Sequence, residues 1–430
     1  MTSVAFNGMW PALRLALGTA SALGFARFAY GLLLPAMRDD LSWTLAAAGA
    51  MSAANGFGYL LGALLTRGLV GRLGAATAFR LAMALTAASL ASTAVSDDHL
   101  TLMILRTLSG ATGAVVFIAG GVLASRLASG VASGTPITVY FAGTGLGIVL
   151  SGVAVPLLGE HWRLAWVALG AAAALATAVS WTAARSEAEA PVTGRARLGP
   201  LLAPALAYLL FAAGYITYIT FLSAYLADHD TSIGQVVLTW AVLGSAVAAA
   251  PAVWTRPITR WPGNRALATL LAVMSAGAAL MLVSSATRVV LASALLYGAT
   301  FMGVPAAVTA LIRARTPAAD WAATLALFTA VFAAGQTAGP WLAGLIADRT
   351  STAATLAWTA VLGAAAALIA LVPAPTRPTL TTHDQPKEKD HDRLRTRTRD
   401  VPRRLVLRGP HSTDAWPRAQ RPPADVDRPE

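Results

Sequence analysis

Long apolar runs, separated by short polar breaks, recur along the chain as far as residue 372. Each run can form a helix of about 20 mostly apolar residues, the length that crosses the hydrocarbon core of a bilayer. We therefore predict twelve transmembrane helices and an all-α integral membrane protein. Their expected bounds are 15–36, 43–66, 77–95, 100–124, 135–157, 163–184, 203–227, 233–254, 266–286, 289–312, 321–346 and 352–372.

The composition agrees with this pattern. Of the 430 residues, 56% are hydrophobic and 12% are charged, whereas about a quarter are charged in an ordinary soluble domain. The absence of cysteine excludes disulfides, cysteine-ligated zinc and a cysteine nucleophile. The six histidines lie outside the long apolar runs, so we expect neither a metal site nor a cofactor. The first apolar run has neither the basic start nor the small-residue cleavage site of a signal peptide, so we expect it to stay in the protein as a helix.

Basic residues in the breaks fall mainly on one side of the predicted membrane. With a cytoplasmic N-terminus, twelve arginines face the cytoplasm and four face outward, as the positive-inside rule requires. This bias predicts a multi-pass protein of the cytoplasmic (inner) membrane with both termini inside. The twelve are Arg67, Arg72, Arg80, Arg126, Arg185, Arg195, Arg197, Arg256, Arg260, Arg265, Arg313 and Arg315, and the four are Arg38, Arg163, Arg288 and Arg349.

The chain divides into two halves that echo each other. An arginine-rich break at 66–80 has a counterpart at 255–265, and the glycine-rich stretch at 143–147 has one at 335–340. Repeated six-helix halves are typical of transporters that bind their solute near the membrane midplane. We predict a bundle over 1–184, a central cytoplasmic loop over 185–202, a second bundle over 203–372 and a disordered basic cytoplasmic tail over 373–430.

Several motifs resemble those of the major facilitator superfamily. Arg106-Thr-Leu-Ser-Gly110-Ala-Thr-Gly113 matches its Arg-x-x-x-Gly-x-x-Gly pattern, and Gly71-Arg72-Leu73-Gly74 is similar to the end of its loop between helices two and three. There Gly71 replaces the usual acid. GFARFAYGLLLPAM at 24–37 and NGFGYLLGAL at 55–64 resemble the YbfB/YjiJ group. The resemblance implies two pseudo-symmetric six-helix bundles, alternating access and a cavity lined by helices one, four, seven and ten.

Two arginines lie deep inside predicted spans, and no carboxylate does. Arg27 is near the middle of the first span and Arg106 lies in the fourth. An arginine at a helix centre costs about 2.5–3.5 kcal/mol on the insertion scale, so such residues mark function by default. Because a guanidinium pairs with carboxylate or phosphate, we hypothesise that an anionic solute docks on Arg27. A structural arginine bonded to neighbouring carbonyls is the competing interpretation.

Polar side chains at similar depth are the other candidates. We expect Tyr30 to share the face of Arg27, and we assign Tyr208 to the aromatic belt at the membrane surface. The candidate solute-binding residues are Arg27, Tyr30, Asn55, Tyr59, Tyr215, Tyr218, Tyr297 and Gln336. The candidate coupling or gating residues are Arg106, Gly110, Arg72, Gly74, Asp39 and Asp40.

These observations predict a secondary active or facilitative transporter of a small anionic organic solute, and no enzyme. The solute moves alone or with a co-transported proton. The expected partners are this solute and the lipid bilayer, with no nucleic acid, and we expect a monomer. Two alternatives stay open: an exporter of amphipathic drugs or metabolites, and a sensor or assembly factor that has a transporter fold without flux.

Overall fold

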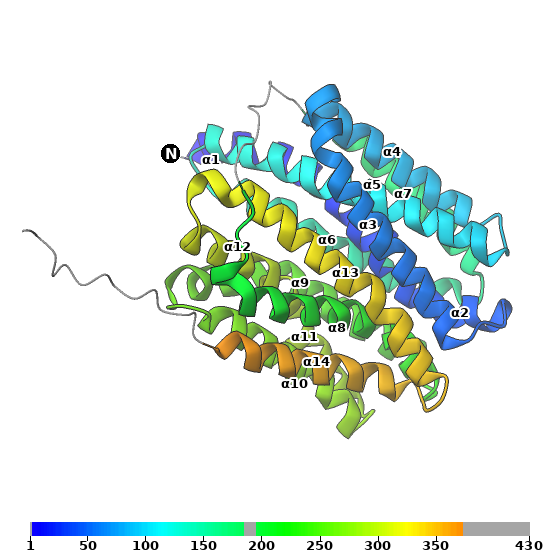
Figure 1. The fold of residues 1–430 in the computed structure, drawn as a ribbon. Helices are drawn as coiled ribbons and strands as arrows, with labels where there is room; N and C mark the ends of the chain where they lie inside the picture. The colour runs from blue at the N-terminus through cyan, green and yellow to red at the C-terminus, as the bar shows by residue number, and fades with distance from the viewer. Residues whose placement is uncertain (1, 185–194, 373–430) are drawn as a thin grey trace, which may run out of the picture. The chain divides into compact units, whose positions relative to one another are not determined.

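Helices make up nearly all of the described chain, which comprises residues 2–184 and 195–372 of the computed structural model (Figure 1). The predicted tail at 373–430 and most of the predicted central loop lie outside these residues. The first half contains α1 (Thr2–Thr19), η1 (Ala20–Phe28), α2 (Tyr30–Asp40), α3 (Leu45–Leu73), α4 (Ala75–Thr93), α5 (His99–Gly130), α6 (Thr135–Ala154), η2 (Pro156–Leu158) and α7 (Trp162–Ser180).

The second half repeats this series of helices. It contains η3 (Gly199–Leu201), α8 (Leu202–Ala227), α9 (Ile233–Arg260), α10 (Arg265–Val283), α11 (Thr287–Phe301), α12 (Gly303–Arg315), η4 (Ala318–Asp320), α13 (Trp321–Ala347) and α14 (Ala353–Leu371). Elements α1, η1 and α2 form one span, and α11 and α12 form another. The described residues thus contain twelve helices that are long and apolar enough to cross a membrane, so the prediction of twelve spans is confirmed.

Two predicted connections are shorter than the sequence pattern suggested. The break at 66–80 is almost entirely helical, because α3 runs to Leu73 and α4 starts at Ala75. Only Gly74 separates them, at φ +78°, a conformation that glycine adopts without steric cost. At 255–265, α9 continues to Arg260. Arginine favours helices, so charge here marks the end of the apolar segment and not the end of the helix.

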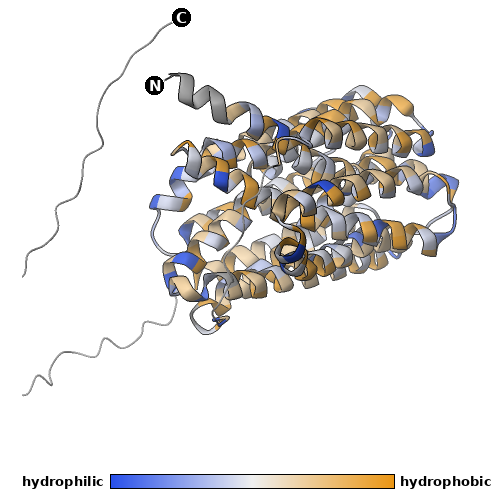
Figure 2. Ribbon diagram, turned by 90° about the horizontal axis from the view of Figure 1, so that it is seen from above, coloured by the Kyte–Doolittle hydropathy of each residue, from blue (hydrophilic) through white to orange (hydrophobic). Residues whose placement is uncertain are grey.

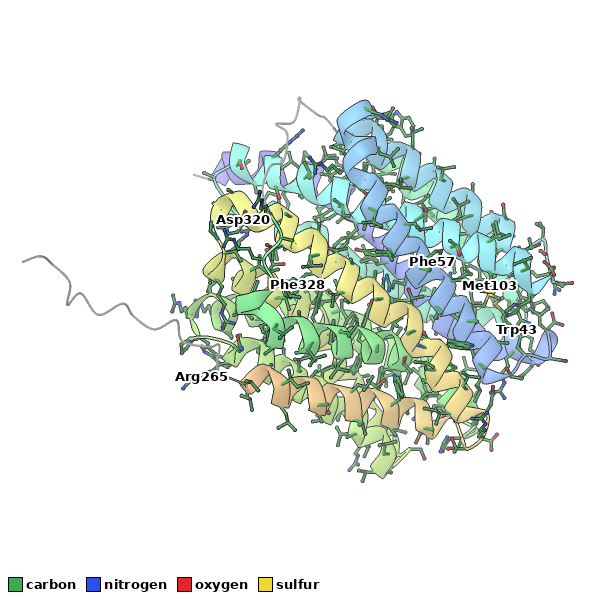
Figure 3. The ribbon with its side chains drawn as sticks, viewed as in Figure 1. Trp43, Phe57, Met103, Arg265, Asp320 and Phe328 are labelled. Atoms are coloured by element: carbon green, nitrogen blue, oxygen red, sulfur yellow. The ribbon has the colours of Figure 1, made fainter. Side chains whose placement is uncertain are left out.

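Charged residues gather at the two ends of the bundle, and Figure 2 shows mainly hydrophobic residues between them. We call the end that carries Asp40, Asp97, Glu160, Asp228 and Asp348 the acidic end. Trp43 lies there, whereas Arg265 and Asp320 lie at the opposite, basic end (Figure 3). An apolar middle with polar ends is the arrangement that a bilayer requires.

Glycines let the helix backbones approach closely. A Cβ added to Gly58 would come within 3.0 Å of the Thr107 carbonyl oxygen, so α3 and α5 can pack at this distance only through glycine. The same holds for the predicted pairs of small residues. Gly143 and Gly147 approach the backbone of α1 and η1, and Gly335 and Gly339 approach that of α8. Such contacts supply the van der Waals packing that associates helices in lipid.

The basic end also holds the start of the second half. The Asp320 carboxylate accepts hydrogen bonds from the backbone N–H of Arg195, at 2.9 Å, and from the Arg197 side chain. The backbone N–H of Arg197 donates to Thr324 Oγ1 at 3.1 Å. These N–H groups stabilise the ionised carboxylate and lower the pKa of Asp320 below its ordinary value. Residues 195–197 are thereby tied to the start of α13.

Two alanine substitutions in α3 test the role of close packing. Gly58→Ala introduces overlap with Thr107, which typically costs about 1–3 kcal/mol, and we expect a lower thermal unfolding temperature in detergent. Gly68→Ala, where nothing lies within 4 Å, gains helix propensity of up to about 1 kcal/mol and should keep or raise this temperature. Equal losses in both variants would contradict the packing argument.

Candidate solute site between the two halves

A π-helix carries the central arginine. Nine residues, Ala20–Phe28, adopt this wider turn in the middle of the first span, and the Ala29 N–H donates to the Gly24 oxygen at 2.9 Å, a separation of five residues. All nine residues are buried, and Arg27 is 5% exposed. Segments of π-helix occur frequently at functional sites because they redirect side chains. Here the π-helix directs Arg27 to the second half.

Arg27 contacts residues from both halves. Its Nη2 donates to Gln336 Oε1 of α13, and its guanidinium carbon lies 5.1 Å from the ring centre of Tyr59 and 5.8 Å from that of Tyr215. Tyr215 also donates its hydroxyl to Gln336 Oε1 at 3.3 Å. The Nε of Arg27 is buried without a hydrogen-bond partner in the structure. The structure thus brings together Arg27, Tyr59, Tyr215 and Gln336 of the predicted solute-binding residues.

Arg106 forms a second buried cationic group beside the first. Its Nη1 donates to the Ala26 carbonyl oxygen at 2.5 Å, which ties α5 to the π-helix next to Arg27. The guanidinium carbon lies 4.8 Å from the ring centre of Tyr30 and 5.5 Å from that of Trp166. Nε and Nη2 are buried without a partner in the structure. Aromatic faces attract such a cation. The coupling role of Arg106 stays a prediction.

Among the described residues, the hydrogen bonds of the two guanidiniums go to a neutral amide and a backbone oxygen, and not to a carboxylate. Within the twelve spans of the described chain, acids occur only as Asp39 and Asp40, the last two residues of the first span. At about 1.5 Å per residue, Asp39 lies roughly 18 Å along the helix from Arg27. A buried charge without a counter-ion is costly, so holding two arginines among neutral groups costs the fold free energy.

Tyr30 and Asn55 belong to the Arg106 group. Beneath that guanidinium, Tyr30 donates its hydroxyl to the Ala48 carbonyl oxygen at 2.8 Å. Asn55 Nδ2 donates to the Arg106 carbonyl oxygen at 3.2 Å and to Ser109 Oγ at 3.1 Å. The expectation that Tyr30 shares the face of Arg27 assumed α-helical spacing, and the π-turn at Ala20–Phe28 changes that spacing. Tyr30 therefore packs under the other arginine.

In the described chain, Tyr218 and Tyr297 contact each other within the second half, and Tyr297 bonds to Tyr215 and not to Arg27. Their rings stack with centres 3.8 Å apart, and the Tyr218 hydroxyl is 2.8 Å from Ser293 Oγ. Tyr297 donates its hydroxyl to the backbone oxygen of Tyr215 at 2.6 Å. Because both hydroxyls are bonded within the second half, these two tyrosines fix the position of Tyr215.

A group of aromatic rings continues from Tyr215 through the second half, and sequence reasoning missed it. Ring centres are 5.0 Å apart for Phe211 and Tyr215, 5.4 Å for Tyr215 and Phe332, and 5.1 Å for Tyr208 and Phe332. We call this group, with Phe328, the aromatic wall. Tyr208 was expected at the membrane surface, but it is buried in this wall. Spacings of three and four residues in 208–215 were the available signal.

The predicted gating residues lie in three separate places. Gly110 faces Asn55, whose carbonyl oxygen would be within 3.0 Å of an added Cβ, so it serves the packing of α3 on α5. Arg72 and Gly74 lie at the basic end, where Gly74 ends α3. Their part in gating stays a prediction.

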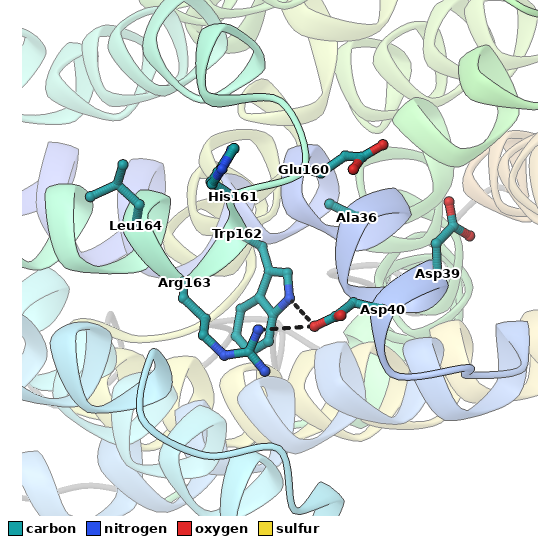
Figure 4. A pocket seen from close by; sticks show the side chains of 8 residues that line it. All are labelled: Ala36, Asp39, Asp40, Glu160, His161, Trp162, Arg163 and Leu164. Atoms are coloured by element: carbon teal, nitrogen blue, oxygen red, sulfur yellow. Dashed lines mark hydrogen bonds and ion pairs between the residues drawn. The ribbon is translucent and has the colours of Figure 1, made fainter.

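Asp39 and Asp40 line a surface pocket at the acidic end (Figure 4). Asp40 accepts hydrogen bonds from Trp162 Nε1 at 2.8 Å and from Arg163 at 3.0 Å. Asp39 lies 3.6 Å from Arg38, and its side chain is 75% exposed. These acids are in contact with solvent and far from Arg27, so the structure separates them from the central site.

Polar contacts join the two halves toward the acidic end. Asp348, which follows α13, accepts hydrogen bonds from the backbone N–H groups of Leu45 at 2.6 Å and Ala46 at 3.0 Å. A carboxylate at a helix N-terminus is favourable because it satisfies free N–H groups and complements the helix dipole. Nearby, the Ser52 and Thr220 hydroxyls are 2.8 Å apart, and Arg38 lies 3.8 Å from Asp228.

Solved structures of transporters share this arrangement of twelve membrane-capable helices in two halves. Crystal structures of the nucleoside transporter NupG (D323A mutant) and a D-xylose–proton symporter both give a TM-score of 0.68. The sequence identities are 12% and 14%, with 83% and 86% of this chain and 99% of each of theirs covered. The human organic anion transporter MFSD10 gives 0.62, with 16% identity over 84% of this chain and 99% of its own.

The family follows from the sequence itself. Residues 19–374 match the family described as "Uncharacterised MFS-type transporter YbfB", and the chain belongs to this family of the major facilitator superfamily. No curated protein sequence matches it significantly. Membership of this family, together with the twelve membrane-capable helices, makes the protein a multi-pass membrane transporter and not an enzyme, as the sequence predicted. Like other transporters of the superfamily, it handles a small-molecule solute.

Arg106→Lys tests whether the planar guanidinium holds the π-helix. Lysine keeps the charge but loses the flat cation–ring contacts and the geometry of the bond to Ala26, so we expect a lower thermal unfolding temperature. Arg256→Lys, at an exposed position near the end of α9, is the matched control and should unfold like the wild type. If the two variants are equally stable, Arg106 does not have this role.

Proposed function

We propose that this protein carries a small organic anion across the cytoplasmic membrane by alternating access, with Arg27 as the residue that receives the anionic group. The observation that supports this most is the state of Arg27. It is buried between the halves, it donates a hydrogen bond to the neutral amide of Gln336, and its Nε has no hydrogen-bond partner among the described residues. A carboxylate or phosphate oxygen is the natural partner for such a group.

The aromatic wall supports a solute with an apolar body. It adjoins Tyr215, which contacts both Arg27 and Gln336. Small-molecule sites are usually apolar and aromatic surfaces with a few polar groups that fix the orientation of the ligand. A solute with an anionic head on Arg27 and a flat or apolar body against the aromatic wall would use both features.

Close contact at the acidic end supports alternating access. There α3 packs on α13 and α2 packs on α8, and Asp348 caps α3 across the halves. A solute could reach Arg27 from that side only after these contacts separate. We assign the acidic end to the outer face and both termini to the cytoplasm because basic residues concentrate at the other end. The predicted bundles, 1–184 and 203–372, would rock as units.

The proposal includes two modes of transport: uniport, in which the solute moves alone, and symport, in which it moves with a proton. No carboxylate lies at the depth of Arg27 in the described spans, so a coupled proton would travel on the solute or bind Asp39 or Asp40. The aromatic wall also favours a second candidate function, export of amphipathic drugs or metabolites, in which Arg27 has no ligand role. The third candidate function is that of a membrane sensor or assembly factor that has a transporter fold but moves no solute.

Ligand-induced thermal stabilisation tests the proposal. We expect benzoate and phenyl phosphate to raise the unfolding temperature of the wild type, and benzamide, the neutral counterpart of benzoate, to leave it unchanged. Arg27→Ala should abolish the rise because the charged partner is lost. Arg27→Lys should retain only part of it because lysine lacks the two-pronged geometry. Counterflow of labelled phenyl phosphate in proteoliposomes then tests for flux.

Arg288→Ala serves as the control, because Arg288 is exposed at the start of α11, and it should respond like the wild type. Stabilisation by tetraphenylphosphonium but by neither anion would favour the drug exporter. Binding of an anion without counterflow would favour the sensor. If both Arg27 variants bind and transport anions normally, the assignment of Arg27 fails.

A further inference from the structure

Gln336 uses both ends of its side-chain amide to join the two halves. Its Oε1 accepts from Arg27 of the first half and from the Tyr215 hydroxyl of the second. Its Nε2 donates to the backbone oxygen of Gly56 in α3 at 3.3 Å. The residue is 0% exposed. A single neutral side chain is therefore the centre of the polar cluster between the halves.

Close packing fixes the amide in this position. The adjacent Gly335 and the nearby Gly339 let α13 approach the backbone of α8 to distances that a Cβ would prevent. On the opposite side, a Cβ added to Gly56 would lie 3.1 Å from the Gln336 backbone oxygen. The glycine-rich stretch that the sequence repeats in both halves thus holds Gln336 between α3 and α8.

The amide oxygen occupies the place of an anionic oxygen, but it uses only half of what Arg27 offers. Nε and Nη2 lie on one edge of the guanidinium, and a carboxylate binds both in the two-pronged arrangement. In the structure Gln336 takes Nη2, while Nε stays without a partner. A carboxylate or phosphate accepts from both nitrogens and carries the opposite charge, whereas the amide oxygen is neutral and accepts from Nη2 alone, so an anion is a better ligand for this edge than the amide.

From these contacts we infer that the Gln336 amide occupies the position on Arg27 that the anionic group of the solute takes. The solute must therefore displace the amide from Arg27 in order to bind. This inference rests on the proposed function. It adds that the amide competes with the solute for Arg27 and does not help to hold it. An anion that takes the guanidinium edge releases the amide, and the release removes hydrogen bonds that cross between the halves.

The release would weaken a continuous line of contacts that ends at the acidic end. From Gly56 and Gln336, α3 and α13 stay in close contact through Gly49 with Pro340 and Leu45 with Gly344. The line ends where Asp348 caps Leu45 and Ala46. We call it the α3–α13 seam. Occupancy of Arg27 by an anion thereby favours separation of the halves along this seam.

Two substitutions separate a competitor from a solute ligand or a packing residue. Gln336→Glu supplies a permanent carboxylate to Arg27, so affinity for benzoate and phenyl phosphate should fall by about tenfold or more. Gln336→Leu removes the competing acceptor at similar volume, so affinity should rise several-fold although the protein is less stable. Opposite signs are expected only of a competitor. Gln235→Glu and Gln235→Leu, at a half-buried position near the start of α9 where the side chain contacts Thr287 and not Arg27, should bind like the wild type.

A second measurement needs no ligand. The sequence has no cysteine, so cysteines introduced by Val95→Cys and Val283→Cys can be spin-labelled selectively. Both positions are exposed at the acidic end, one in each half. Double electron–electron resonance between the two labels then measures the separation of the halves. We expect longer distances in Gln336→Leu without any anion, and short distances in Gln336→Glu with or without phenyl phosphate. In the wild type, phenyl phosphate should lengthen the distance.

The outcomes distinguish this inference from the proposed function. If no anion binds the wild type or any variant, the proposed function fails, and the ligand-free distances alone then decide the role of Gln336 in the seam. Weaker anion binding in both Gln336 variants would overturn the inference, because it would make Gln336 a ligand of the solute. A wild-type distance in Gln336→Leu without anion would overturn it as well.

Discussion

The central constraint on this structure is a positive charge held in a membrane interior that offers it no acid. Arg27 of the first span and Arg106 of the fourth are both buried, and Arg106 binds the backbone next to Arg27. The carboxylates of the described spans lie only at the end of the first span. Each surrounding feature reduces the cost of these charges with neutral groups. Aromatic faces cover both guanidiniums, a backbone oxygen binds Arg106, and the Gln336 amide binds Arg27. The unpartnered nitrogens show that this compensation is incomplete.

Backbone packing places these neutral groups. Glycines bring α3 against α5 and α13 against both α3 and α8, so hydroxyls, amides and rings reach the arginines over short distances. The π-helix in the first span works in the same direction, since it turns Arg27 to the second half while Tyr30 packs under Arg106. A rigid scaffold built from glycine contacts thus surrounds a polar cluster that joins the halves through few hydrogen bonds. Glycine contacts of this kind occur within each half and also between the halves, where α3 meets α13 and α6 meets α9.

Sequence reasoning succeeded where a single helix or a single charge decides the outcome. Twelve spans followed from run length alone, and Arg27 stood out because an arginine near the middle of a span has no route to the surface. It was less successful where the outcome depended on neighbours. Tyr208 looks like a residue of the membrane surface from its position, yet the rings of α8 and α13 bury it. The structure places Tyr59, Tyr215 and Gln336 around Arg27, whereas Tyr30 and Asn55 contact Arg106.

The sequence by itself determined the class of fold, the family and the presence of two unpaired cations in the membrane, because hydrophobic length, motif spacing and the count of acids are properties of the chain. Tertiary structure decided which groups face those cations. Helical periodicity could not predict the π-turn that separates Tyr30 from Arg27, and no local pattern reveals that Gln336, more than 300 residues away in the chain, supplies the acceptor. Partners of a buried charge depend on how helices pack against one another, and that packing is fixed only when all twelve are in place.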